Sequence, residues 1–281
     1  MPLDLDTRQR AMLKEMGVEV WLPGPSFAPQ NVVAPSQPTR AVSKAAPNAS
    51  VAPAPRAGSG QPSSPSSSHS NDLSKINTLN WDALADTASQ CQACGLCGGR
   101  KNSTLIAMPE GALATWMVVG DPPDEEEDAS GAPFAGEAGL LLDNMLKAVG
   151  AVRMGAGKEG GEQRSQALVT NITKCRPPQG RVPQAAELAQ CAAYLQREIA
   201  LTQPKLILVM GRFASQVLLA EHPDALALPL GKQRGVVYRY QGIAVVVTYA
   251  PKALLRSGAD KAKAWTDLCL AMAELDRAQL N

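Results

Sequence analysis

The sequence is poor in aromatic residues and histidine, and it has no long hydrophobic run. Aromatic residues make up 4% of its 281 residues, so a core must be built mainly from aliphatic side chains and methionine. No stretch of about 18 consecutive apolar residues occurs, which argues against a membrane-spanning segment. The first residues lack a basic segment followed by an apolar one, which argues against secretion and favours a cytoplasmic protein.

An excess of charge of either sign is also lacking. The chain has 27 basic and 26 acidic residues, so its composition neither indicates nor excludes a nucleic-acid partner. Any attraction to phosphate must come from a local basic patch. Hydrophobic residues reach 45%, which is enough for a sizeable core.

The composition divides the chain into three parts. Residues 1–22 contain a short helical pattern, which predicts either a segment that docks on a protein partner or on the core, or a frayed terminus. Residues 23–78 are rich in Pro, Ala, Ser, Gly and Gln and predict a disordered linker, because they cannot bury enough apolar surface to offset the entropy of ordering. Residues 79–281 have the composition of a globular domain.

The globular part alternates between strand and helix patterns. Short apolar runs rich in β-branched residues occur at 114–119, 167–172, 205–210 and 243–248, and helical patterns occur at 139–149, 185–201, 213–219 and 261–275. Continuous apolar strands are typical of a sheet that is covered on both faces. The pattern predicts a three-layer α/β/α sandwich with a central, four-stranded, mostly parallel sheet, whose functional loops follow the strand C-terminal ends.

Five of the six cysteines suggest a metal centre. Cys91, Cys94 and Cys97 form two overlapping C-x2-C units, and Cys175 and Cys191 lie further along the chain. Thiolates at this spacing can converge from one turn on a zinc ion or on one corner of an iron–sulfur cluster. Cys191 also fits an ordinary core position on an apolar helix face. Zinc and an iron–sulfur cluster both stay open on the residues alone.

Four segments, in chain order, resemble the motifs of the type-4 uracil-DNA glycosylases. They are Cys91-x2-Cys94-x-Leu96-x3-Arg100, residues 120–128 (GDPPDEEED) with 131–136 (GAPFAG), residues 170–178 (TNITKCRPP), and residues 248–256 (TYAPKALLR). The resemblance covers about 190 residues, roughly 88–277. It implies a nucleoid-associated DNA repair enzyme that extrudes uracil from DNA and hydrolyses its N-glycosidic bond. It also implies a [4Fe–4S] cluster held by Cys91, Cys94, Cys175 and Cys191.

The resemblance also implies roles for the residues of a base pocket. Phe134 would stack on the extruded uracil, and Asn171 would bind its polar edge with both the donor and the acceptor of its amide. Gly120 would contact the substrate in the same loop. Asp121 stands where the family has a Glu that positions or activates water, and a carboxylate there can also stabilise an oxocarbenium-like sugar. The rest of the acidic run, residues 125–128, is expected to be mostly a solvated loop.

Contacts to DNA are expected from two loops. The resemblance implies that Leu254 and Leu255 form an apolar wedge that fills the gap left by the extruded base, with Arg256 beside them. Arg176, together with Lys174 and Arg181, forms a basic group around the second cysteine loop that suits phosphates.

Besides Asp121, two further positions depart from the family pattern. Ala250 replaces a His that donates a hydrogen bond to the uracil O2 as the base leaves, and Asp124 replaces a Gly. Lys252 and Tyr249 are candidate donors from the same loop. Three hypotheses follow: a uracil-DNA glycosylase, a catalytically weak or inactive DNA-binding relative, and a glycosylase with a shifted base preference.

Overall fold

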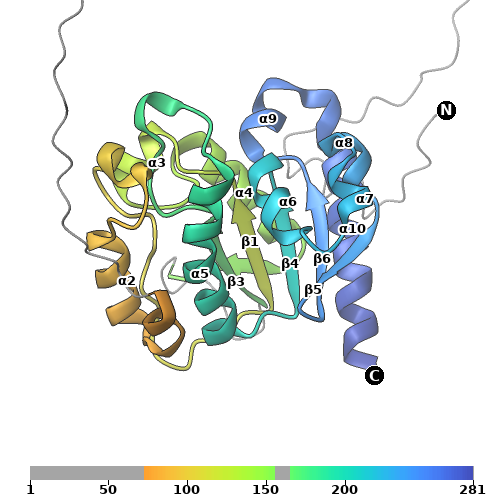
Figure 1. The fold of residues 1–281 in the computed structure, drawn as a ribbon. Helices are drawn as coiled ribbons and strands as arrows, with labels where there is room; N and C mark the ends of the chain where they lie inside the picture. The colour runs from red at the N-terminus through yellow and green to blue at the C-terminus, as the bar shows by residue number, and fades with distance from the viewer. Residues whose placement is uncertain (1–72, 156–164, 281) are drawn as a thin grey trace, which may run out of the picture. The chain divides into compact units, whose positions relative to one another are not determined.

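The computed structural model describes residues 73–155 and 165–280. They form a six-stranded sheet in the order β2-β3-β1-β4-β6-β5, with helices on both faces (Figure 1). The strands are β1 (Trp116–Gly120), β2 (Ala151–Arg153), β3 (Ser165–Asn171), β4 (Leu206–Met210), β5 (Val237–Tyr240) and β6 (Ile243–Thr248). The predicted α/β fold class is confirmed.

The four predicted strands are β1, β3, β4 and β6, and they lie side by side in parallel. Their register aligns the C-terminal ends: Gly120 lies beside Asn171 and Met210, and Met210 lies beside Thr248. The loops that leave these four residues therefore meet at one edge of the sheet, where ligands of open α/β sheets usually bind.

The predicted number of four strands is wrong, because the sheet has one further strand at each of its two edges. β2 has only three residues, too few to give a pattern. β5 is antiparallel to β6 and joins it through Gln241 and Gly242, whose φ angles of 49° and 84° form a two-residue hairpin turn. As an edge strand, β5 is only partly buried, so it lacks the continuous apolar run of the central strands.

Helices cover the sheet in two layers, each with its own core. One face carries α2 (Trp81–Gln90), α5 (Ala185–Thr202) and α6 (Arg212–Leu218), and the other carries α4 (Gly136–Ala148), α9 (Pro251–Arg256) and α10 (Lys261–Leu280). Along β1, Met117 and Val119 enter the first core while Trp116 and Val118 enter the second, as the two-residue period of a strand requires. The shorter helices are α3 (Glu125–Ser130), α7 (Pro223–Leu226), α8 (Leu230–Gln233), and the 3₁₀ turns η1 (Leu73–Thr78), η2 (Gly95–Gly99), η3 (Pro178–Gly180) and η4 (Gly258–Asp260).

The predicted boundary between linker and domain at residue 79 needs correction. Residues 73–78 form η1, and Ile76 is buried in the first core. The domain therefore begins at or before Leu73. The predicted N-terminal helix and the rest of the linker lie outside the described residues. Within the described part of the chain, we find no helix with the length and apolar character that a membrane crossing needs.

Candidate functional site

A cavity of about 170 Å³ lies where the C-terminal ends of β1, β3, β4 and β6 meet. Its walls are formed by Asp121, Pro122, Asp124, Glu127, Phe134, Ala138, Asn171, Met210, Ala250, Pro251 and Lys252. We call it the base pocket. The structure thus brings together Asp121, Phe134 and Asn171, three of the residues predicted to act in one site, with Ala250 beside them.

Phe134 is held in a conformation that few side chains adopt. Its φ is 52°, in the left-handed region that is unfavourable for a residue with a bulky side chain. Its N–H donates to Glu127 Oε1 over 2.6 Å, and the carbonyl of Pro133 accepts from Arg153 Nη1 over 2.8 Å. A Cβ on Gly120 would lie 2.5 Å from the Phe134 ring atom Cζ, so only glycine allows this packing. Gly120 does not line the base pocket; it supports the aromatic wall.

Glu127 is buried and joins three segments of the site. Its carboxylate accepts from Asp124 N (2.9 Å), Phe134 N (2.6 Å) and Asn171 Nδ2 (3.1 Å). Burial raises the pKa of Glu127, while the hydrogen bonds from Phe134 and Asn171 act to lower it. The prediction of a solvated loop is therefore wrong for Glu127, and also for the buried Asp128. The capping box between Asp124 and Glu127, visible as D-x-x-E before a short helix, is the sequence signal that could have identified Glu127.

Asn171 ends β3 and keeps one polar atom available. Its Nδ2 donates to the carbonyl of Asp121 (2.9 Å) and to Glu127 Oε1 (3.1 Å). Its Oδ1 is buried and has no hydrogen-bond partner within the part of the chain that the structure describes. Because a buried, unpaired acceptor is costly, this oxygen is suited to a ligand N–H.

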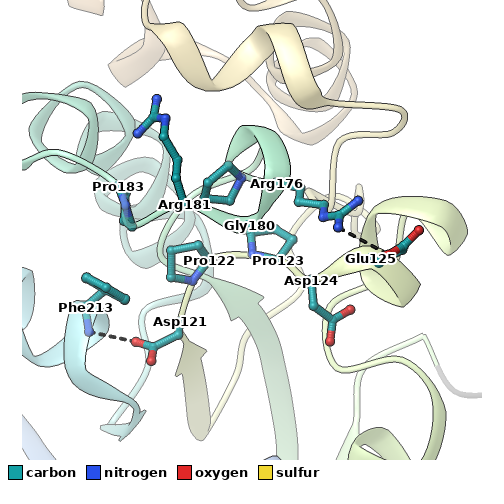
Figure 2. A pocket seen from close by; sticks show the side chains of 11 residues that line it. Asp121, Pro122, Pro123, Asp124, Glu125, Arg176, Gly180, Arg181, Pro183 and Phe213 are labelled. Carbon is teal, nitrogen blue, oxygen red and sulfur yellow. Dashed lines mark hydrogen bonds and ion pairs between the residues drawn. The ribbon is translucent and has the colours of Figure 1, made fainter. Parts of the chain in front are cut away.

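Asp121 binds the backbone amides at the start of α6, a contact that the sequence did not reveal. Its Oδ1 accepts from Phe213 N (2.7 Å) and Ala214 N (3.2 Å), and its Oδ2 accepts from Arg212 N (3.2 Å). Figure 2 shows the Asp121 carboxylate directed at Phe213 at the start of α6. Burial raises the pKa of Asp121, and the three amide hydrogen bonds act against that rise. Since an ionised carboxylate has about four acceptor positions, one stays open for water.

The segment after β6 contributes Ala250 and Lys252 to the base pocket. Ala250 precedes α9 and presents a methyl group, whereas Lys252 forms an ion pair with Asp124. Burial lowers the pKa of Lys252, and nearby Arg256 lowers it further. Of the two leucines predicted to contact DNA, Leu254 is fully buried in the second core, whereas Leu255 is 45% exposed.

The five candidate thiols line one cavity, although they come from separate segments. Cys91, Cys94 and Cys97 follow α2, Cys175 follows β3, and Cys191 lies on α5. Among residues 73–155 and 165–280, no three His, Cys, Asp or Glu side chains form a group that could hold a metal ion.

Two of these sulfurs receive hydrogen bonds from the surrounding protein. Arg100 Nη1 donates to Cys175 Sγ (3.2 Å), and the backbone N–H of Lys174 donates to Cys191 Sγ (3.3 Å). Burial raises the pKa of Cys175 to about 11 and that of Cys191 to about 12. N–H donors to cysteine sulfur are common around iron–sulfur clusters, where they tune the cluster, so these two contacts are compatible with such a group.

Lys174 does not belong to the predicted basic surface, because it is buried. Its ammonium donates to Thr170 Oγ1 (2.6 Å), the Asn171 carbonyl (2.9 Å) and Glu198 Oε2 (2.6 Å). This ion pair ties the loop between Asn171 and Cys175 to α5. Arg176 and Arg181 lie on the loop beyond it, with side chains 23% and 38% exposed.

Comparisons with known proteins agree with this geometry. The model of the uracil DNA glycosylase superfamily matches residues 109–270. The type-4 uracil-DNA glycosylase of Saccharolobus solfataricus is 35% identical over 180 residues, which are 63% of this chain and 77% of the relative. Those of Pyrobaculum aerophilum and Thermotoga maritima are each 33% identical; the alignments cover 68% and 63% of this chain, and 93% and 83% of the relatives. The residues that match the family model include all the strands of the described sheet, the base pocket, Cys175 and Cys191. Because this match covers more than half of the chain, the chain belongs to the uracil DNA glycosylase superfamily.

Proposed function

We propose that this protein is a uracil-DNA glycosylase, which hydrolyses the N-glycosidic bond of uracil in DNA and leaves an abasic site. The observation that carries the proposal is the base pocket, in which Phe134 and Asn171 border one small cavity and the buried Oδ1 of Asn171 has no hydrogen-bond partner within the described part of the chain. The names of the curated relatives, type-4 uracil-DNA glycosylases, support the same reaction.

Recognition of uracil would rest on the amide of Asn171. Uracil carries a hydrogen on N3, which can be donated to the free Oδ1 of Asn171, whereas cytosine has an unprotonated acceptor at that position. A site with a buried acceptor rejects a base that leaves it unpaired. The cavity of about 170 Å³ suits one pyrimidine ring lying against Phe134.

The hydrolysis would rest on Asp121. The open acceptor position of its carboxylate can hold a water molecule and direct its oxygen at C1′ of the deoxyribose. The negative charge also stabilises the positive charge that develops on the sugar as the bond breaks. Ala250 supplies no donor to the departing base, so we assign that role to Lys252, whose ammonium lies in the wall of the same pocket.

The thiols would hold a [4Fe–4S] cluster through Cys91, Cys94, Cys175 and Cys191. When bound, such a group supplies a covalent anchor between segments that are distant in the sequence. The loop between Asn171 and Cys175 would then be fixed at both ends, by β3 and by the anchor. This fixes Asn171 relative to Phe134.

DNA is the partner that this chemistry requires. The exposed Leu255 would fill the space vacated by the base, and Arg256 and Arg176 would contact the backbone phosphates. Affinity that depends on such contacts falls steeply as the salt concentration rises.

The test is excision of uracil from a labelled oligonucleotide, scored by strand cleavage after alkali. The wild-type protein, prepared without oxygen, is expected to cleave, and Asn171→Ala is expected to lose about 10²-fold or more in kcat/KM. Asn144→Ala, at an exposed position on α4, is the matched control and should keep full activity. Absence of cleavage by stoichiometric wild-type protein, on both single- and double-stranded DNA, would contradict the proposal.

A further inference from the structure

A second, larger cavity adjoins the base pocket. It has a volume of about 390 Å³ and shares Asp121, Pro122 and Asp124 with the base pocket. Figure 2 shows it between the loop that follows β1, the loop 176–183 and the start of α6. One continuous ligand could therefore extend from the base pocket, past these three shared residues, into the second cavity.

The lining of this cavity is apolar and rigid. Pro122, Pro123, Pro177 and Pro183 contribute ring faces, and the side chain of Phe213 is half-buried at one end. Proline rings lose little conformational entropy on binding, and an aromatic ring offers a stacking surface to any base. Asp121 fixes Phe213 in place, because its carboxylate accepts the Phe213 amide hydrogen over 2.7 Å.

Two guanidinium groups, those of Arg176 and Arg181, line the cavity, and that of Arg212 lies next to the lining residue Phe213. Arg176 pairs with Glu125 over 3.2 Å, but Glu125 is 74% exposed, so a phosphate can replace it at little cost. Arg181 is oriented by a two-point contact with Glu187 and by the Val182 carbonyl, which together occupy three of its five N–H groups. The exposed Arg212 lies over the Phe213 ring, with its Cζ 4.6 Å from the ring centroid.

The acidic groups of the cavity are already engaged. Asp121 accepts three amide hydrogens of α6, and Asp124 is paired with Lys252. The groups left to a ligand are therefore apolar ring faces and guanidinium N–H donors. This combination matches a nucleotide, with a flat base and an anionic phosphate.

We propose that this cavity binds the nucleotide next to the extruded uracil on the same strand, with its base against Phe213 and its phosphate between Arg176 and Arg181. The inference rests on the proposed function and extends it: the enzyme reads two consecutive nucleotides as a unit. The shared wall places the neighbouring nucleotide, rather than a distant one, in the second cavity.

The test compares oligonucleotides in which single bases are missing. In single-stranded substrates with one uracil, a tetrahydrofuran spacer replaces the nucleotide on the 5′ side, on the 3′ side, or three positions away. The wild-type kcat/KM is expected to fall about tenfold for the spacer on one adjacent side, and to stay unchanged for the distant spacer. Equal kcat/KM on all four substrates would overturn the inference while leaving the proposed function intact.

Variants then assign the effect to the cavity. On the complete substrate, the kcat/KM of Phe213→Ala should fall to the value that the wild type has with the adjacent spacer. Introducing that spacer should then cause no further change in the kcat/KM of Phe213→Ala. Phe213→Tyr should retain the response. Gln216→Ala, exposed on the same helix, is the control and should behave as wild type. A Phe213→Ala enzyme that still loses tenfold with the adjacent spacer would show that another surface holds the neighbouring base.

A binding measurement, in which no uracil is excised, tests the same contact independently of the reaction rate. The Kd of fluorescent oligonucleotides that carry the same spacers should rise about tenfold for the same adjacent side in the wild type, and should not change in Phe213→Ala. A mononucleotide, thymidine 5′-monophosphate, distinguishes a site for free nucleotides. If it abolishes oligonucleotide binding while the adjacent spacer has no effect, the cavity is a free-nucleotide site and the inference is wrong.

Discussion

At the scale of single residues, Ala250 most directly limits the proposed reaction. Its methyl group stands in the wall of the base pocket where the resembled family has a hydrogen-bond donor. Loss of one preorganised donor costs about 10²–10³ in rate in other enzymes. We therefore expect Ala250→His to raise kcat for uracil excision at least tenfold, as measured under single-turnover conditions.

A matched control separates this gain from the mere addition of an imidazole. Ala253 lies on α9 outside the base pocket, so Ala253→His should leave kcat unchanged. If Ala250→His is no faster than wild type, the ammonium of Lys252 alone, to which we assign this role, already supplies all of the hydrogen bonding that the imidazole would add.

Gly120 offers a test of the aromatic wall. An alanine methyl would lie within 3 Å of two ring atoms of Phe134, so the ring must move out of position. We expect Gly120→Ala to lower kcat/KM at least tenfold and to reduce the free energy of unfolding by about 1–3 kcal/mol. Gly258→Ala is the control, because nothing lies within 4 Å of its added Cβ. Unchanged kinetics for Gly120→Ala would mean that the position of Phe134 is not critical.

The residues that line the base pocket were predictable where a motif carried them and not elsewhere. Phe134 and Asn171 follow from short segments whose spacing resembles a known family, and both line the base pocket. Glu127 was missed because a buried glutamate within an acidic run looks like its solvated neighbours. Leu254 and Leu255 are chemically alike, and only the packing of α9 separates the buried residue from the exposed one.

At the scale of elements, α6 and the base pocket share Asp121. Loss of the three amide hydrogen bonds in Asp121→Ala should reduce the free energy of unfolding by about 1–2 kcal/mol. Loss of the carboxylate that we propose to position water should lower kcat by about 10²–10⁴. Asn80→Ala, which removes the cap of α2 far from the pocket, should cost similar stability and leave kcat unchanged. Equal kcat for Asp121→Ala and wild type would exclude the catalytic role.

The pH dependence of the reaction follows from the same carboxylate. Because burial raises the pKa of Asp121, the acid limb of kcat should lie above the ordinary aspartate value of about 3.9. A raised folded-state pKa also means that the contribution of Asp121 to stability is largest below that ordinary value and is lost as the pH rises through the folded-state pKa. Asp121→Asn should remove the acid limb from the profile; a limb that persists belongs to another group.

The buried pair of Lys174 and Glu198 joins the cysteine loop to α5. Glu198→Ala leaves a buried ammonium without its counter-charge, which should reduce the free energy of unfolding by about 3–5 kcal/mol in urea denaturation. The double variant Lys174→Met with Glu198→Leu removes both charges and should be the more stable of the two. If the single and double variants are equally stable, the buried charge is not the cause.

The more deeply a strand is buried, the more clearly its sequence predicted it. The four central strands are covered on both faces, so their sequences are continuous apolar runs. The edge strands β2 and β5 are short or half exposed, and pairing with a neighbour, rather than their own pattern, makes them strands. The 3₁₀ turn η1 follows a long polar region, and only the burial of Ile76 reveals that it belongs to the domain.

At the scale of the whole molecule, the proposed cluster would connect α2, the loop after β3 and α5. Removal of iron by a chelator should abolish the absorbance near 400 nm and lower Tm. If the cluster stabilises the fold by only about 3 kcal/mol, its removal should lower Tm by about 6–12 °C in a domain of this size. Cys175→Ser should lose its iron, whereas Cys97→Ser and Cys269→Ser should retain it; loss of iron in Cys97→Ser would change the proposed ligand set.

The two edges of the sheet also determine how the molecule behaves at high concentration. An open edge strand exposes unpaired N–H and C=O groups that can pair with a second chain, and natural proteins counter this with short strands and charged side chains. Here β2 has only three residues, and β5 carries Arg239, which is held by Glu274 on α10. Aggregation through intermolecular β-pairing is therefore disfavoured at both edges.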